Sequence, residues 1–330
     1  MHKIKLLIVI PCLNEENSLE SVIKSCPNKI KTIDKIDILV IDDGSNDNTG
    51  AIAKKNNCLL ITNSSNLGLG TSISKGFEYA RERNYDYMTN IDGDNQFDPK
   101  DIIKLAKPVL DGHADIVTGS RFVNKNLTPK NMPLIKKLGN KLFSQIVSFL
   151  SNENLKDVSC GFRFYNSEAI LKINLFGKFT YTHEMLISFS AQRLRIKEVP
   201  INVIYHKNRK SNISGNLIKY GFNSLIIILR TFRDYFPMKF FMYLSLFFLV
   251  PSILFFLIFI NHYLTTGFFS GFLFAGLSSG FLFLISLIFF IVGIIADMLS
   301  RIRENQEELI YINRKFLYTK KEDKKFLKSI

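Results

Sequence analysis

One long uncharged stretch limits what this chain can fold into. Residues 240–296 contain no Lys, Arg, Asp or Glu, although the whole chain of 330 residues carries a formal net charge of +14. One bilayer crossing needs about 20 apolar residues, so the stretch is long enough for two. It divides at a polar patch made of Asn261, His262, Thr265, Thr266 and Gly267. The sequence therefore predicts two transmembrane helices, residues 240–260 and residues 272–296. The alternative is a buried hairpin of a soluble protein, whose core helices are rarely uncharged over such a span.

The positive charges predict how these helices are oriented. The flanking basic residues are Arg230, Arg233 and Lys239 before the helices and Arg301 and Arg303 after them. The loop between the helices has no Lys or Arg, so the positive-inside bias places both flanks and the N-terminal part of the chain in the cytoplasm. Residues 297–330 are predicted to be a basic cytoplasmic tail, which fits an anionic leaflet surface or simple solvation equally well. Because the charge follows the membrane flanks, it argues against nucleic-acid binding.

The part before the membrane segment alternates between strand and helix patterns. Short apolar runs predict strands at residues 5–10, 36–41, 59–62, 87–91 and 116–118, with a later strand at residues 198–203. Helical patterns lie at residues 18–25, 49–56, 71–83, 99–110, 136–150 and 182–191. Continuous apolar strands between helices indicate an α/β fold with a mostly parallel sheet covered on both faces. Residues 215–239 are predicted to form a juxtamembrane amphipathic helix, which either lies among lipid headgroups or packs against the protein.

A polar, turn-prone cluster follows each of four predicted strands. The clusters are Pro11-Cys12-Leu13-Asn14-Glu15, Asp42-Asp43-Gly44-Ser45, Asp92-Gly93-Asp94 and Gly119-Ser120-Arg121. In open α/β sheets the ligand crevice lies outside the carboxyl ends of the strands. The four clusters are therefore expected to converge on one site.

The segment that begins at Asp92 carries the sharpest local signal for a metal. Asp92 and Asp94 follow a strand two residues apart, and such a pair of hard oxygen ligands suits Mg²⁺ or Mn²⁺. An EF-hand loop is excluded, because Phe97 stands where that loop needs Gly and Ile103 stands where it needs Glu. The alternative is a turn followed by a helix that Asp98 caps. We favour that interpretation for Asp98, and from these residues alone both interpretations stay open for Asp92 and Asp94.

The motifs in their order resemble those of the inverting glycosyltransferases of family 2. They are P-x-x-N-E at residues 11–15, D-D-G-S at 42–45, N-x-G-x-G at 66–70, D-x-D-x-Q at 92–96, G-S-R at 119–121 and E-V-P-I at 198–201. Within that family the chain is similar to the group of dolichyl-phosphate mannosyltransferases and polyprenyl-phosphate glycosyltransferases. The resemblance covers about residues 4–209. It implies a glycosyltransferase-A type (Rossmann-like) catalytic domain at residues 1–214, followed by the two transmembrane helices.

The resemblance also implies a role for each matching residue. Nucleotide-sugar binding falls to Pro11, Asn14, Glu15, Asp42, Asp43, Asp92 and Gly93. The metal ligands are Asp92, Asp94 and Gln96. The catalytic residues are Asp94, Arg121 and Arg209, and the acceptor-phosphate ligands are Arg121, Lys136, Lys137 and Arg209. Asp157, Gly161, Phe162 and Arg163 resemble a segment that closes over the sugar. Glu184 matches a position where similar enzymes have an acidic residue. Residues 206–215 depart from the family pattern R-x-x-G-x-S-K, which leaves the alignment of Arg209 less secure than that of Arg121.

The function implied by the resemblance is hexose transfer to a membrane lipid. The donor is a nucleotide-sugar, GDP-mannose or UDP-glucose, the acceptor is a polyprenyl or dolichyl phosphate, and the cofactor is Mg²⁺ or Mn²⁺. The reaction inverts the anomeric centre, and homo-oligomerisation is left open. One alternative is a transferase with another acceptor, such as a growing polysaccharide, although the chain lacks Trp and therefore the Q-x-x-R-W element of processive synthases. A non-catalytic membrane scaffold of the same fold is the second alternative.

Overall fold

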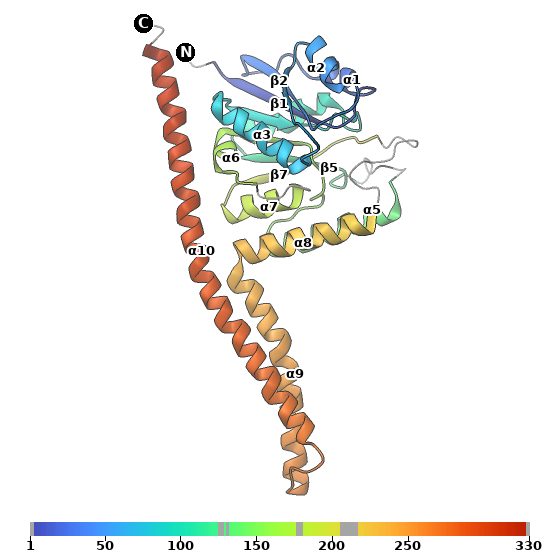
Figure 1. The fold of residues 1–330 in the computed structure, drawn as a ribbon, viewed down its shortest axis with the longest axis vertical. Helices are drawn as coiled ribbons and strands as arrows, with labels where there is room; N and C mark the ends of the chain where they lie inside the picture. Colours follow the sequence, from blue (N-terminus) through green and yellow to red (C-terminus); the bar gives the residue numbers. More distant parts are fainter. Residues whose placement is uncertain (1–2, 125–128, 130–131, 176–180, 205–216, 328–330) are drawn as a thin grey trace. The chain divides into compact units, whose positions relative to one another are not determined.

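The computed structural model describes residues 3–124, 129, 132–175, 181–204 and 217–327 (Figure 1). It divides into two compact units. The first, here called the α/β unit, comprises Met1–Ile228 and Ile310–Ile330. The second, here called the hairpin unit, is Leu229–Leu309.

The described part of the α/β unit is built on one sheet with the strand order β3-β2-β1-β4-β6-β5-β7. The strands are β1 Lys5–Cys12, β2 Lys35–Asp42, β3 Leu59–Thr62, β4 Tyr87–Asn90, β5 Ile116–Ser120, β6 Arg163–Asn166 and β7 Ile196–Pro200. Neighbouring strands are parallel except at β6, which runs antiparallel to both β4 and β5. The predicted mostly parallel sheet of a glycosyltransferase-A type fold is therefore confirmed.

Helices cover both faces of this sheet. The helices before the hairpin are α1 Leu19–Ser25, α2 Thr49–Lys55, α3 Leu69–Glu82, the 3-10 turn η1 Pro99–Asp101, α4 Ile102–Leu110, α5 Leu134–Ser151, α6 Ser167–Lys172, α7 Thr182–Ala191 and α8 Leu217–Tyr235, of which α8 is divided between the two units. Successive side chains of β1 enter two separate cores, as the alternation of a strand requires. Leu6, Ile8 and Ile10 pack with residues of α1 and α4, whereas Leu7 and Val9 pack with residues of α3 and α7.

The C-terminal segment of α10 (Leu273–Leu327) packs on α6 within the α/β unit. Arg314 donates from Nη1 to the carbonyl oxygens of Leu171 (2.8 Å) and Ile173 (3.1 Å), and from Nη2 to Oδ1 of Asn174 (2.9 Å). Tyr311 donates from its hydroxyl to a carboxylate oxygen of Glu168 at 2.9 Å. The last carbonyl groups of a helix have no partner within that helix, so Arg314 supplies donors that the end of α6 needs.

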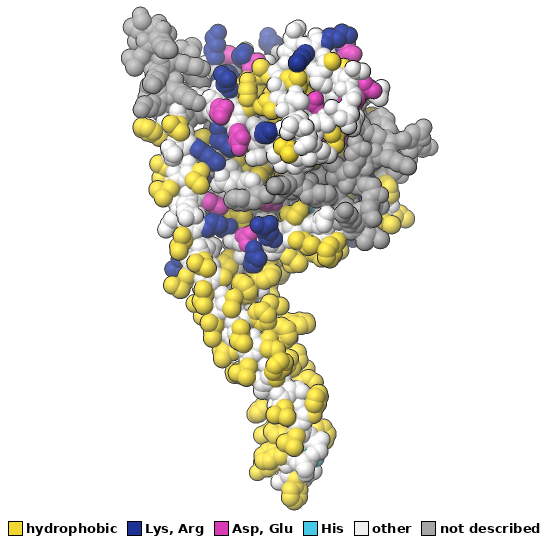
Figure 2. All heavy atoms as spheres, viewed as in Figure 1, with side chains coloured by type: hydrophobic (Ala, Val, Ile, Leu, Met, Phe, Trp, Pro, Cys, Tyr) yellow, Lys and Arg dark blue, Asp and Glu magenta, His cyan; other side chains and the backbone are white. Residues whose placement is uncertain are grey.

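The hairpin unit contains α9 (Pro237–Thr266) and the first part of α10, two helices that are long and apolar enough to cross a membrane. Their outward side chains form a hydrophobic surface (Figure 2). Inside the pair, the hydroxyls of Ser245 and Ser286 are 2.9 Å apart, and Ser252 donates to the carbonyl oxygen of Ser279 at 2.9 Å. Hydroxyl side chains that bond across the pair are a common means of holding helices together in lipid.

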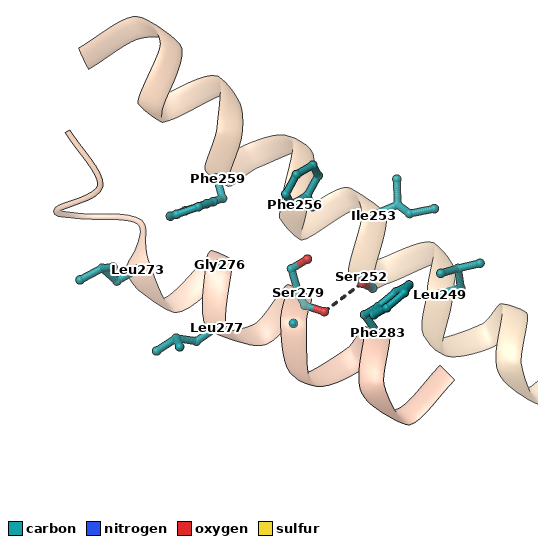
Figure 3. Close-up of a pocket in the computed structure, with 11 residues that line it drawn as sticks. Leu249, Ser252, Ile253, Phe256, Phe259, Leu273, Gly276, Leu277, Ser279 and Phe283 are labelled. Carbon is teal, nitrogen blue, oxygen red and sulfur yellow. Dashed lines mark hydrogen bonds between the residues drawn. The ribbon is translucent and has the colours of Figure 1, made fainter. Parts of the chain in front are cut away.

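The two helices leave a cavity of about 620 Å³ between them (Figure 3). Its lining is almost entirely apolar and includes Leu249, Phe256, Leu273 and Gly280, and the Ser252–Ser279 hydrogen bond crosses it. At Gly280 an added Cβ would meet nothing within 4 Å.

Candidate active site

The carboxyl ends of β1, β2 and β4 bring four acidic side chains around one thiol. Cys12 at the end of β1 pairs in register with Asp42 of β2, and Val9 of β1 pairs with Asn90 of β4. Burial raises the pKa of the Cys12 thiol well above its usual value, and the negative charges of Glu15, Asp42, Asp92 and Asp47 raise this pKa further. Three of the acidic residues that the sequence predicts to bind the donor, Glu15, Asp42 and Asp92, therefore gather at one place.

The loops after β1 and β2 are locked together through Asn14. This residue adopts the left-handed conformation, with φ of 57°. Its backbone N–H donates to the Ser45 hydroxyl at 2.9 Å, and its Oδ1 accepts from the backbone N–H of Asn46 at 2.9 Å. Asn14 thereby fixes the D-D-G-S loop beside Pro11, which is the buried penultimate residue of β1.

Asp42 and Asp43 are both buried, and they serve different loops. Asp42 Oδ1 accepts from the backbone N–H of Ser45 at 3.0 Å, within its own loop. The Asp43 carboxylate accepts from Asn63 Nδ2 (2.7 Å) and from the backbone N–H groups of Leu67 and Gly68 (2.9 Å each). An ionised carboxylate offers about four acceptor positions, and these three bonds hold the N-x-G-x-G loop in front of α3.

The D-x-D loop packs against the end of β1 with little space to spare. The Ser18 hydroxyl lies 2.8 Å from a carboxylate oxygen of Glu15 and 2.8 Å from the carbonyl oxygen of Gly93. A Cβ added to Gly93 would lie 2.7 Å from Cys12 Sγ, which is closer than real Cβ atoms approach. Gly93 is thus required by the close approach of this loop to β1.

Asp92 and Asp94 are both partly exposed, so their carboxylates are accessible to an ion from solution. Asp94 Oδ1 accepts from the backbone N–H of Gln96 at 3.0 Å, and the Gln96 carbonyl accepts from the backbone N–H of Ile204 at 2.9 Å. Among the described residues, no group of three or more His, Cys, Asp or Glu side chains forms a metal cage. Two carboxylates nevertheless fit Mg²⁺ or Mn²⁺, because such ions commonly take their other ligands from substrate phosphates and water.

Asp98, in contrast, has a structural role. Its Oδ1 accepts from the backbone N–H of Lys100 at 3.0 Å, which makes it the N-cap of η1 ahead of Pro99. The capping interpretation of Asp98 is therefore confirmed. This capping role distinguishes Asp98 from Asp92 and Asp94, which precede it in the motif.

A buried network of polar side chains lies next to Asp92. Asn90 Nδ2 donates to the Tyr181 hydroxyl at 2.7 Å, and Tyr165 donates to Asn90 Oδ1 at 2.9 Å. The Tyr181 hydroxyl in turn donates to the carbonyl of Gly161 at 3.0 Å. A Cβ at Gly161 would lie 3.8 Å from both carboxylate oxygens of Asp92. Sequence reasoning missed Asn90, Tyr165 and Tyr181, and the only available signal was the polar Asn90 at the end of an apolar strand.

Arg121 is held by a buried carboxylate from a distant part of the chain. Its Nε donates to Asp157 Oδ2 at 2.7 Å, its Nη2 donates to Asp157 Oδ1 at 2.6 Å, and its backbone N–H donates to Oδ2 at 2.9 Å. Nη2 also donates to the Ser159 hydroxyl at 2.7 Å. The Glu198 carboxylate accepts from the backbone N–H groups of Lys156 and Asp157 at 2.9 Å and 2.8 Å, which fixes the segment that carries Asp157.

Of the four basic residues predicted to bind phosphate, the structure describes Arg121, Lys136 and Lys137. Lys136, on α5, lies close enough to Arg121 that the arginine's charge, after burial, lowers the pKa of its amino group. Lys137 is exposed on the same helix. Arg209 lies outside the described residues, and Glu184 is buried on α7.

Two proteins of known activity class resemble much of this chain. A UDP-N-acetylglucosamine–dolichyl-phosphate N-acetylglucosaminyltransferase of Methanococcus voltae is 31% identical over 235 residues, which are 65% of this chain and 91% of that protein. A polyprenol monophosphomannose synthase of Mycolicibacterium smegmatis is 28% identical over 227 residues, which are 64% of this chain and 82% of that protein.

The fold is also similar to that of a solved enzyme. Glucosyl-3-phosphoglycerate synthase from Mycobacterium tuberculosis, in complex with Mn²⁺, UDP-glucose and phosphoglyceric acid, matches with a TM-score of 0.55. The match covers 69% of this chain and 79% of that one at 21% identity, so it supports the fold alone. The sequence profile described as glycosyl transferase family 2 matches residues 7–173. This chain belongs to glycosyl transferase family 2 and is a glycosyltransferase.

Proposed function

We propose that this glycosyltransferase moves a hexose from GDP-mannose or UDP-glucose to a polyprenyl or dolichyl phosphate, with inversion at the anomeric carbon. The observation that supports the proposal is a site with an acidic side and a basic side. The same chain has two helices long enough to cross a bilayer. Acidic groups gather around Cys12 at the ends of β1, β2 and β4. Arg121 and Lys136 form the basic side. The similarity to two transferases named for lipid-linked products or acceptors supports a lipid phosphate acceptor.

The acidic side is the proposed donor site. Asp92, Asp94 and Gln96 would hold Mg²⁺ or Mn²⁺, which supplies Lewis-acid stabilisation of the charge that develops on the departing diphosphate. The proposed nucleotide-sugar ligands are Pro11, Asn14, Glu15, Asp42, Asp43, Asp92 and Gly93. Of these, Asn14 and Asp43 also shape the loops that surround the nucleotide.

The basic side is the proposed acceptor site. Arg121, Lys136, Lys137 and Arg209 would bind the phosphate of the lipid. That phosphate is anionic at neutral pH, so the reaction needs no strong general base, and catalysis consists mainly of holding attacking and leaving groups in line. Asp157 orients the Arg121 guanidinium, since a bidentate ion pair fixes both its direction and its plane.

A lipid acceptor requires the enzyme to work at the membrane surface. We propose that residues 240–260 and 272–296 cross the bilayer and that residues 1–214, 215–239 and 297–330 lie at or near its cytoplasmic face as catalytic domain, juxtamembrane helix and tail. A polyprenyl chain stays in the bilayer, so an anchored enzyme meets its acceptor at a raised effective concentration.

Sugar transfer to lipid tests this proposal directly. Membranes containing the full chain are incubated with each radiolabelled nucleotide-sugar and a polyprenyl phosphate, and the organic phase is counted. Asp94→Asn should lower lipid-extractable label by about 100-fold or more, because it removes one ligand charge from the metal. Asp98→Asn keeps the cap of η1 and should change the label less than about twofold. Label that appears only in a water-soluble product would contradict the lipid acceptor, and equal activities of the two variants would contradict the metal site.

A further inference from the structure

One face of α10 carries exposed apolar side chains beyond the point where the uncharged stretch ends. Five apolar residues and the exposed Asn305 recur along this face in alternating steps of four and three residues. Together with Asn305 they are here called the outer seam, and they are Ile291 (48% exposed), Ile295 (53%), Met298 (63%), Ile302 (55%) and Leu309 (66%). Two such steps span seven residues, which is the repeat of helices that wind around one another in a coiled coil.

The opposite face of α10 is already occupied within the hairpin unit. Gly293, Ser300 and Glu307 each stand two residues before a residue of the outer seam, which is about 200° around an α-helix. A Cβ at Gly293 would lie 3.0 Å from Phe241 Cβ, so this face contacts α9. Ser300 is buried, and the Tyr235 hydroxyl donates to a carboxylate oxygen of Glu307 at 3.4 Å. The outer seam therefore points away from α9 and from the end of α8.

In the proposed membrane arrangement, lipid covers the first part of the outer seam and not the last. Ile302 and Leu309 lie beyond Asp297, which is the first charged residue after the uncharged stretch. An α-helix rises about 1.5 Å per residue, so Leu309 is about 18 Å along α10 from Asp297. Residues 297–309 include four acidic and two basic residues, a balance that an anionic leaflet repels. The exposed Ile302 and Leu309 side chains therefore indicate a protein partner.

A second copy of the same chain fits this seam. All copies of one chain enter a membrane with the same orientation, so their α10 helices run parallel to one another. In a symmetric parallel pair each Asn305 faces the Asn305 of the second copy, and an amide side chain can both donate and accept a hydrogen bond. Arg301, which directly precedes Ile302, faces Gln306 of the second copy across the seam, so a donor meets an acceptor there and no like charges oppose each other.

We propose that two copies of this chain pair through the outer seam of α10, in a parallel coiled coil that continues from the bilayer-length hairpin. A single polar residue in an otherwise apolar seam, here Asn305, fixes the register of such a pair. The parallel direction rests on the proposed membrane crossing. The pairing itself does not depend on sugar transfer.

Disulfide formation between copies of the full chain in membranes tests which residues meet. Single cysteines are introduced in a background where Cys26 and Cys58 are replaced by Ser, since Cys12 and Cys160 are buried. A disulfide requires Cα atoms about 4.4–6.8 Å apart, so it forms only between positions that face each other closely.

Ile302→Cys and Leu309→Cys should each give a disulfide-linked dimer under a mild oxidant, because equivalent seam residues face each other in a parallel pair. Glu304→Cys is the control, since Glu304 is exposed on the same helix but lies outside the outer seam. An antiparallel pair would join position 302 to position 309 instead of joining each position to itself. Failure of either seam variant to form a dimer, or an equal yield of dimer from Glu304→Cys, overturns the proposal. A disulfide to a different protein also overturns it.

The strength of the pair is measured by native mass spectrometry of the full chain in detergent over a series of protein concentrations. The parent protein should appear with the mass of two copies. Leu309→Asp should raise the dissociation constant of this dimer about 100-fold or more, because it buries two like charges in the seam. Ile310→Asp is the matched control, since Ile310 is the next residue, is 42% exposed and lies outside the outer seam. It should change the dissociation constant less than about threefold.

A monomeric parent protein, or equal effects of the two aspartate variants, would overturn the proposal. Neither measurement uses a sugar donor or a lipid acceptor. A failure of the proposed reaction is therefore distinguishable from a failure of the proposed pairing.

Discussion

The Arg121 guanidinium and the Asp157 carboxylate form an ion pair in which both side chains are almost completely buried, at 10% and 0% exposure. Burying two charges costs much solvation energy, and the pair is stable only while both members are present. The backbone N–H of Arg121 and the Ser159 hydroxyl complete the arrangement. At this residue, stability and the proposed phosphate binding depend on the same contacts.

Asp157→Ala should therefore destabilise the α/β unit strongly. We expect a loss of about 3–5 kcal/mol in the free energy of unfolding, because the variant leaves a buried arginine without its counter-charge. Urea unfolding of the full chain in detergent, followed by circular dichroism, measures this loss. Asp115→Ala is the control, because Asp115 also pairs with an arginine, Arg195, whose side chain is 58% exposed. A loss for Asp157→Ala no larger than for the control would contradict the account.

His183 is the second buried ionisable side chain that should affect stability. It is fully buried and packs edge-to-face with Phe143, with ring centroids 5.6 Å apart. Burial, with a smaller effect of the Arg163 charge, lowers the pKa of His183 to about 4. The imidazole is therefore neutral in the folded protein at pH values where an unfolded chain, with a pKa near 6.5, already binds a proton.

The sign of the resulting pH dependence is fixed. The contribution of His183 to the free energy of unfolding is fully present above about pH 6.5. It is lost as the pH drops toward about 4, and the loss is on the order of 3 kcal/mol in total. His183→Gln should flatten this part of the curve of unfolding free energy against pH. His113→Gln, at an exposed site, should leave the curve of the parent protein unchanged. A His183→Gln curve parallel to that of the parent would refute the assignment.

Local sequence signals identified some site residues and could not identify others. Asp92, Asp94 and Asp98 stand together in one motif, and capping rules predicted the structural role of Asp98 correctly. The partner of Arg121 is 36 residues away in the sequence, and Tyr181 bonds to Asn90 across 91 residues. Such contacts depend on which strands become neighbours, and no local pattern carries that information.

At the scale of elements, the β–α alternation was predictable and the strand order was not. The apolar runs of β1, β2 and β3 are continuous or nearly so, and their predicted positions agree with the structure to within two residues. β6 was missed because it has only four residues, begins with Arg163 and ends with Asn166. It forms a strand because β4 and β5 pair with it on both sides, and such tertiary pairing outweighs local propensity.

The C-terminal end of α10 also has more structure than its composition indicates. The sequence suggested a basic tail, whereas a helix continues to Leu327 and docks on α6 through Tyr311 and Arg314. Arg81 donates to the carbonyl of Ile170 at 3.1 Å, so two arginines serve the end of the same short helix. This docking holds the last part of α10 against α6 within the α/β unit.

Arg314→Ala should release that segment. Amide hydrogen exchange of residues 311–317 should become about tenfold faster, because hydrogen bonds worth roughly 1.4 kcal/mol or more are lost locally. Ile312→Ala is the control, since Ile312 lies in the same segment of the helix and its side chain is 51% exposed. If the amide hydrogens of residues 311–317 exchanged at the same rate in the two variants, Arg314 would not hold the segment.

At the scale of the whole molecule, two different patterns in the sequence predicted the helical hairpin and the α/β fold. The uncharged stretch indicated the hairpin, and α9 and α10 contain it as bilayer-length helices. The ordered motifs indicated the family, and the sequence profile and the fold agree with that assignment. The exposure of Leu134, Leu138, Leu142 and Phe149 on one face of α5 was not predicted. The same residues fit a helix face that is buried in the domain, and the sequence does not show which face of a helix the rest of the domain covers.

The central claim is that Asp92 and Asp94 hold a divalent metal beside the donor diphosphate. An experimental structure of the full chain with Mn²⁺ and a nucleoside diphosphate, examined by anomalous scattering from manganese, tests it most directly. The account predicts one manganese peak within about 2.0–2.4 Å of oxygens of these two carboxylates and of the diphosphate. A peak bound elsewhere, with both carboxylates turned away from the nucleotide, would contradict it.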